Sequence, residues 1–149
     1  MSTTPLDLTA DWDKTFPRSS AVRHHKVSFH NRFGIELAAD LYIPEDASAP
    51  LSALAVSGPF GAVKEQASGL YAQHMAERGF LALAFDPSYT GESGGTPRRV
   101  SSPDINTEDF SAAVDFLAAC DDVNADAIGI IGNCIKSDEL MSHRDRKKC

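Results

Sequence analysis

The thiol of Cys134 is the side chain whose type and setting most strongly suggest covalent chemistry. It follows an apolar stretch, Ala127–Ile131, through Gly132 and Asn133. A thiolate attacks carbonyl carbons, and a nucleophile held on a sharp turn between a strand and a helix needs small neighbours because the backbone there is strained. Gly132 meets this need two residues before Cys134, but Lys136 stands where a second small residue is expected. The pattern predicts Cys134 as a nucleophile position in a turn that fits on one side only.

Activation of this thiol requires a partner, since a thiol with an ordinary pKa of about 8.5 is only slightly ionised at pH 7. Asp138, His143 and Asp145 have suitable types. On a helix following Cys134, however, His143 would lie about 13 Å further along, too far for a hydrogen bond.

A zinc site of Cys134, His143 and Cys149 lacks a fourth ligand and matches no common spacing. We therefore expect no metal site and no cofactor, and we interpret the remaining histidines as surface or satisfied side chains: His24, His25, His30 and His74.

The elements that must position Cys134 begin with a predicted hairpin. Apolar and polar residues roughly alternate over Val22–Phe29 and over Ile35–Ile43, as is typical of half-buried strands. Turn-forming residues lie between them, ending in Gly34. Before the hairpin, Met1–Ser20 has only scattered apolar residues and is expected to be a lead-in arm.

A third strand, Leu51–Val56, is expected next, followed by the loop Ser57–Gly61. Ala67–Arg78 is predicted as a helix that ends at Gly79, where a left-handed conformation suits a glycine. Its buried face is expected to include Leu70, His74 or Met75, and Ala76.

The segment Phe80–Phe85 is entirely apolar and short, which predicts a strand covered on both faces. A long glycine-containing loop, Asp86–Pro97, follows it. The next helix is expected to begin with Asn106 as its N-cap and Asp109 in its first turn, and to end near Cys120. Its apolar stripe comprises Phe110, Val114 and Leu117, and the strand Ala127–Ile131 comes after it.

Alternating strands and helices predict an α/β fold with a mostly parallel sheet and helices on both faces. The order of these elements, the loop Ser57-Gly58-Pro59-Phe60-Gly61 with the following Val63-Lys64-Glu65-Gln66, and the run Phe85-Asp86-Pro87-Ser88-Tyr89-Thr90-Gly91-Glu92-Ser93-Gly94-Gly95 together resemble the α/β-hydrolase family. The resemblance is to the dienelactone-hydrolase-like and prokaryotic esterase or peptidase-like branch. It covers about Val22 to Cys134, corresponding to the N-terminal half of that fold: an antiparallel hairpin followed by a mostly parallel sheet with flanking helices.

This resemblance implies roles for particular residues. Cys134 would be the nucleophile on the elbow, acting on a small ester or lactone, and the backbone N–H groups of Phe60, Gly61 and Ile135 would be candidates to bind the oxyanion. The loop that begins at Asp86 would shape the floor of the site and be held by Asp and Ser hydrogen bonds to the backbone. The catalytic acid and histidine of the family follow later strands, and we do not find them in this sequence.

The chain divides on this basis into an arm (1–20), a partial α/β-hydrolase domain (21–135) and an atypical charged tail (136–149). The tail has almost no apolar stripe, and a change of frame or splice near Asn133 explains it more economically than a private C-terminus does. Three functions stay open: a hydrolase of small esters or lactones, a catalytically inactive fragment, or a binding module that completes its sheet with another chain, including a second copy of itself.

The amino-acid composition limits the kinds of partner that the chain can bind. The chain has 14 Lys and Arg against 21 Asp and Glu, a net charge of −7, which argues against nucleic acid or an anionic membrane surface as a ligand. It has no apolar run long enough for a membrane helix and no signal-peptide pattern, so we expect a cytoplasmic protein. Its three cysteines are expected to be free thiols.

Overall fold

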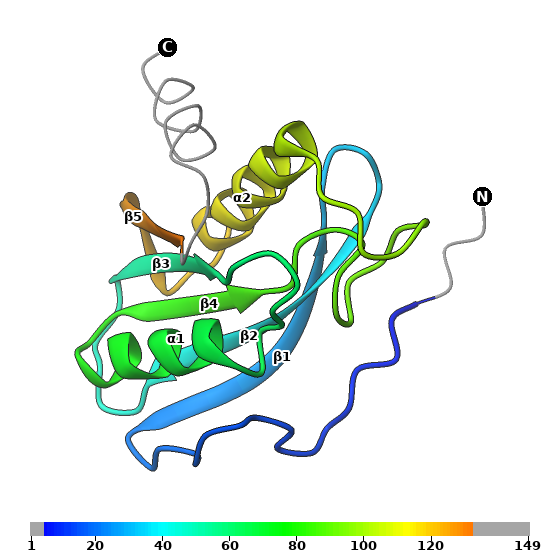
Figure 1. Ribbon diagram of the computed structural model, residues 1–149. Helices are drawn as coiled ribbons and strands as arrows, with labels where there is room; N and C mark the ends of the chain where they lie inside the picture. Colours follow the sequence, from blue (N-terminus) through cyan, green and yellow to red (C-terminus); the bar gives the residue numbers. More distant parts are fainter. Residues whose placement is uncertain (1–4, 133–149) are drawn as a thin grey trace.

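A computed structural model describes residues 5–132 of the 149-residue chain, and these form one mixed five-stranded sheet with a helix on each face (Figure 1). The strand order across the sheet is β1-β2-β4-β3-β5. In chain order the elements are β1 (Val22–His30), β2 (Glu36–Pro44), β3 (Leu51–Ser57), α1 (Ala67–Glu77), β4 (Leu81–Phe85), α2 (Pro103–Ala118) and β5 (Val123–Gly132).

The predicted hairpin is confirmed, with β1 and β2 antiparallel over their whole length from Val22 opposite Pro44 to His30 opposite Glu36. The sheet then changes direction: β4 is antiparallel to β2, but β3 is parallel to both β4 and β5. Parallel strands need long crossovers, and α1 and α2 supply them. The carboxyl ends of β3, β4 and β5 consequently lie at one edge of the sheet.

Alternation along the strands produces two cores. On one face, the predicted stripe of α2 packs with Phe29 and Phe85, and the ring centroids of Phe85 and Phe110 are 5.1 Å apart. On the other face, Ala72 and Ala76 of α1 pack against Val56. β4 contributes to both faces and is buried throughout, as its uninterrupted apolar sequence predicts.

The predicted face of α1 is wrong in part. Leu70 is exposed, and the buried face consists of small and polar residues: Ser68, Gly69, Ala72, Gln73 and Ala76. The reason is close packing of backbones, since a Cβ atom on Gly69 would lie 2.2 Å from the carbonyl oxygen of Lys64. The end of the helix is as expected, because Gly79 has a φ of 99°.

The predicted start of α2 is also wrong. The helix begins at Pro103 with Ser102 as N-cap, because proline has a preset φ that suits a first helical position. Asn106 is therefore inside the helix, and its amide donates to Ser101 Oγ at 3.0 Å. Asp109 lies beyond the first turn and is fully buried. Within residues 5–132, no helix has the length and apolar character that crossing a membrane requires.

The arm is an integral part of the fold. Phe16 is buried in the α1-side core, and Trp12 stacks edge-on against it with its indole N–H donating to the Phe16 carbonyl at 2.8 Å. Lys14 pairs with the buried Asp40 of β2 at 3.1 Å. The last strand, β5, likewise exceeds its predicted extent, since it begins at Val123.

Candidate functional site

A pocket of about 330 Å³ opens where β3 and β4 end, the usual position for a ligand site in an open α/β sheet. Its walls come from the loop after β3, the loop after β4 and the first turns of α2. Three phenylalanine rings and three prolines contribute, and the few polar groups are uncharged. The lining residues are Ser57, Gly58, Pro59, Phe60, Gly61, Ala62, Phe85, Pro87, Thr90, Val100, Ser101, Pro103, Asn106 and Phe110.

The wall after β3 is a tight turn. The Ala62 N–H donates to the Pro59 carbonyl at 3.0 Å, and Gly61 has a φ of 84°, which explains a glycine at this position. Among the described residues, the N–H groups of Phe60 and Gly61 have no hydrogen-bond acceptor. Both residues line the pocket, so two unused backbone donors lie at its wall.

The wall after β4 is held by Asp86, as predicted. Its Oδ1 accepts the Lys64 N–H at 2.7 Å, and its Oδ2 accepts the Glu92 N–H at 3.0 Å. Ser93 Oγ donates to the Asp86 carbonyl at 2.7 Å and accepts the Ala38 N–H at 2.8 Å. Burial raises the pKa of the Asp86 carboxyl to about 6, although Lys64 and the two backbone N–H groups work in the opposite direction.

A second buried carboxylate, Asp109, secures the same loop from the side of α2. Its two oxygens accept the Ser88 N–H and the Ser88 hydroxyl, each at 2.7 Å, and the Asn31 side-chain amide at 2.9 Å. Burial raises its pKa despite these bonds. Asp109 thereby connects the turn of the hairpin, the loop after β4 and the helix that lines the pocket.

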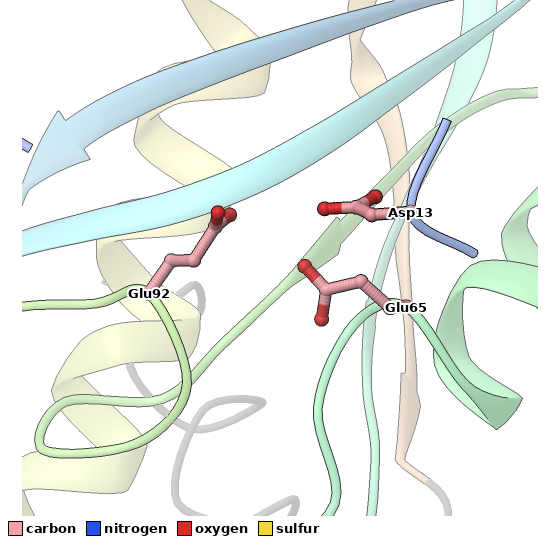
Figure 2. A group of neighbouring side chains, drawn as sticks. All are labelled: Asp13, Glu65 and Glu92. Atoms are coloured by element: carbon pink, nitrogen blue, oxygen red, sulfur yellow. The ribbon is translucent and has the colours of Figure 1, made fainter. Parts of the chain in front are cut away.

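Three further carboxylates, Asp13, Glu65 and Glu92, point toward one another from the arm and from the loops after β3 and β4 (Figure 2). Their oxygens lie within 4.8 Å of one another, a spacing that a metal ion could use. Lysine ammonium groups already occupy this cluster: Lys26 contacts Asp13 at 2.7 Å and Glu92 at 3.0 Å, and Lys64 contacts Glu65 and Glu92. The positive charge that a cation would bring is supplied by the chain itself.

The residues predicted from sequence are only partly within the described structure. Phe60 and Gly61 line the pocket, and Phe60 is 69% exposed. Cys134 and Ile135 lie outside the described residues, as do the predicted domain limit at 135 and the tail; in sequence Cys134 comes two residues after the end of β5.

No histidine within residues 5–132 lines the pocket. His24 bonds Asp40 at 2.7 Å and His74 bonds Glu77 at 3.0 Å, so both are satisfied side chains as expected. The sequence interpretation missed the role of Lys64. The available signal was a lysine in the short glycine-rich loop that runs from a strand into a helix.

Comparisons with known proteins find a matching family, similar sequences and similar solved structures. Residues 34–136 match the X-Pro dipeptidyl-peptidase family (S15). The chain is 67% identical to the protein PA2218 of Pseudomonas aeruginosa over 130 residues. This aligned region is 87% of this chain and 35% of PA2218. The crystal structure of PA2218 superposes with a TM-score of 0.90 at 61% identity, over 95% of this chain and 44% of the other.

Two more distant proteins are also similar. The thiohydrolase aneE of Aspergillus aculeatus is 36% identical over 109 residues, which are 73% of this chain and 33% of that protein. The dienelactone hydrolase-like promiscuous phosphotriesterase P91 from metagenomic libraries shares the fold, with a TM-score of 0.67 at 18% identity over 87% of this chain and 56% of the other. The chain spans about a third of the length of the curated relatives it matches.

Proposed function

Because this chain belongs to the X-Pro dipeptidyl-peptidase (S15) family, within the α/β-hydrolases, we propose that it provides the nucleophile and oxyanion groups of a site that hydrolyses small esters or lactones. In this proposal Cys134 is the nucleophile, and the backbone N–H groups of Phe60, Gly61 and Ile135 bind the oxyanion. The observation that carries it is the pocket at the ends of β3 and β4, with the unused N–H groups of Phe60 and Gly61 at its wall.

The chemistry has two stages. The Cys134 thiolate attacks the carbonyl carbon, and the carbonyl electron pair moves onto oxygen, where backbone N–H donors stabilise the charge. Collapse of this intermediate expels the alcohol oxygen, which takes a proton, and leaves an acyl thioester on Cys134. Water then releases the acid and the thiol. Proton transfer in both stages needs a base, and no histidine within residues 5–132 lines the pocket.

The lining favours an uncharged acyl group. No lysine, arginine or carboxylate among residues 5–132 lines the pocket, whereas the rings of Phe60, Phe85 and Phe110 do. A dipeptidyl-peptidase substrate carries a cationic amino terminus, and an ammonium group in an apolar site without a counter-charge is strongly disfavoured. This is why we propose esters and lactones, and the similarity to a thiohydrolase is consistent with acyl chemistry.

The test is release of nitrophenolate from p-nitrophenyl acetate by the whole chain, measured for the wild type and for Cys134→Ala. Cys120→Ala is the matched control, because Cys120 is a partly buried thiol just beyond the C-terminal end of α2, whereas the N-terminal part of that helix lines the pocket. We expect Cys134→Ala to lose the reaction and Cys120→Ala to retain it. Equal rates in wild type and Cys134→Ala would refute the assignment of the nucleophile.

A second candidate is a binding module that completes its sheet with another chain. It is favoured by β5, which pairs with β3 on one side and has no second neighbour within residues 5–132. Ile128, Ile130 and Ile131 are only partly buried there. A concentration-dependent dimer in light scattering, with slow amide exchange in β5, would support this function. A monomer with fast exchange in β5 would exclude it.

A further inference from the structure

Asp86 connects the two loops that form the walls of the pocket. One of its oxygens accepts the N–H of Lys64 in the loop after β3, and the other accepts the N–H of Glu92 in the loop after β4. The side chain is completely buried. Charge-assisted bonds of this kind are stronger than neutral ones, and without solvent access they are not exchanged for bonds to water. A single carboxylate thus fixes the distance between the two walls.

The Lys64 ammonium reinforces the same connection. Its side chain is fully buried, and Nζ lies 3.3 Å from Asp86 Oδ2 and 2.5 Å from Glu92 Oε2, with Glu65 as a third partner. A buried ammonium persists only when it is well paired, so the lysine cannot leave this position without exposing itself or orphaning its partners. Lys64 therefore holds its own loop against both Asp86 and Glu92.

The connection extends beyond the pocket to the rest of the fold. Glu92 also accepts from Lys26 of β1 at 3.0 Å, and Lys26 reaches Asp13 of the arm at 2.7 Å. Asp13, Glu65 and Glu92 converge from three separate segments in Figure 2. The loop positions are consequently fixed relative to the hairpin and the arm as well as to each other.

The turn that offers the unused N–H groups is separated from Lys64 by one residue, Val63, in the same loop. It is closed by one backbone bond, from Ala62 to Pro59. We propose that Asp86, acting through Lys64, is a positioning residue that holds the Pro59–Ala62 turn so that the N–H groups of Phe60 and Gly61 stay at the pocket wall. This inference rests on the proposed function for its catalytic meaning, but the positioning can be measured without catalysis.

The proposal includes a pH dependence. Burial raises the Asp86 pKa to about 6, and the charged groups facing Asp86 are Lys64, Glu65 and Glu92, with Lys26 and Asp13 behind them. Burial acts to raise the Glu92 pKa, but its bonds to Lys64 and Lys26 outweigh this and hold that pKa below its ordinary value of 4.5. Between pH 6 and 4.5, Asp86 therefore gains a proton while Glu92 stays ionised. A protonated Asp86 stays buried but accepts the Lys64 and Glu92 N–H groups less strongly, so the turn is expected to loosen locally even though protonation stabilises the fold as a whole.

The test is amide exchange at Ala62, Lys64 and Glu92, followed by NMR in the whole chain and corrected for intrinsic rates. Asp86→Asn keeps the shape but replaces one acceptor with a donor. Asp109→Asn is the matched control, because Asp109 is equally buried and holds the same loop at Ser88. We expect Asp86→Asn to speed exchange at the three amides at least about tenfold, as for loss of a charge-assisted bond, and Asp109→Asn to leave them near wild type.

A second measurement applies to the wild type and needs no variant that might fail to fold. Protection of the same amides, and the affinity of the pocket for acetanilide, an uncharged analogue of an aryl ester, should fall together from pH 7 to pH 5. Both should be insensitive to pH in Asp86→Asn. Amide protection that is independent of pH in the wild type would overturn the positioning role. So would an equal increase in exchange at these amides in Asp86→Asn and Asp109→Asn. If protection follows Asp86 but Cys134 is never acylated, the positioning role stands and the proposed hydrolase fails.

Discussion

Replacing Asp86 by asparagine should change how the stability of the fold depends on pH. In the folded chain the Asp86 pKa is raised from 3.8 to about 6, so the fold binds this proton more tightly than the unfolded chain does. The contribution of Asp86 to stability is then fully present below pH 3.8 and is lost as the pH rises through 6. A shift of about two pKa units corresponds to about 3 kcal/mol. Asparagine cannot titrate, so the variant lacks this loss.

Urea unfolding at pH 4, 5, 6 and 7 measures the effect. The chain has a single tryptophan, Trp12, which packs against Phe16 and His24 and reports unfolding by its fluorescence. We expect the free energy of unfolding of Asp86→Asn minus that of the wild type to rise by about 2 kcal/mol between pH 4 and pH 7, because part of the contribution is already lost at pH 4. Titrating groups that do not contact Asp86 act equally in both proteins and cancel in the difference.

Parallel stability curves for the two proteins would refute this reasoning. They would mean that Asp86 titrates in the fold as it does in the unfolded chain, which is incompatible with a carboxylate buried among Lys64, Glu65 and Glu92. A difference of the opposite sign would mean that Lys64 stabilises the ionised form more than burial disfavours it.

Three further changes follow from the packing and the charges. Phe16→Ala should lower the free energy of unfolding by about 3–5 kcal/mol, because the ring is buried in the core on the α1 face of the sheet. Phe33→Ala, at a ring that is 54% exposed, should change it by no more than about 0.5 kcal/mol in the same urea assay. Gly69→Ala should cost at least about 1–3 kcal/mol, since its Cβ would meet the Lys64 carbonyl at 2.2 Å; a neutral effect by calorimetry would contradict the close approach of α1. Cys120 should react slowly with iodoacetamide at pH 7 and faster as pH rises, because burial and then Asp122 and Asp121 raise its thiol pKa; fast alkylation at pH 7 would disprove that shift.

Local patterns predict much of the fold because they depend on neighbours in sequence. Alternation locates the hairpin, the apolar run Phe80–Phe85 predicts a strand buried on both faces, and Phe110, Val114 and Leu117 indicate the buried stripe of α2. The role of Asp86 is also predictable, because an aspartate in a glycine-rich loop commonly bonds to nearby backbone N–H groups.

The sequence predictions are wrong or incomplete where contacts between segments distant in the sequence determine the structure. The buried face of α1 consists of small residues that allow backbones to approach closely, so it carries little hydrophobic signal and Leu70 is left exposed. The arm is fixed by contacts of Lys14 and Phe16 with other parts of the fold, which no local pattern contains. The pairing of Lys64 with Glu92 joins residues 28 positions apart and requires the folded sheet.

The most direct measurement of the central claim, that this chain presents an acyl-accepting thiol beside two backbone donors, is peptide-mapping mass spectrometry after reaction of the whole chain with p-nitrophenyl acetate at pH 7.5. The acyl group should be found on Cys134, not on Cys120 or Cys149, and labelling of Cys134 should be faster than that of the same thiol in urea. Labelling spread evenly over the three thiols, or no faster in the native chain than in urea, would contradict the proposed site.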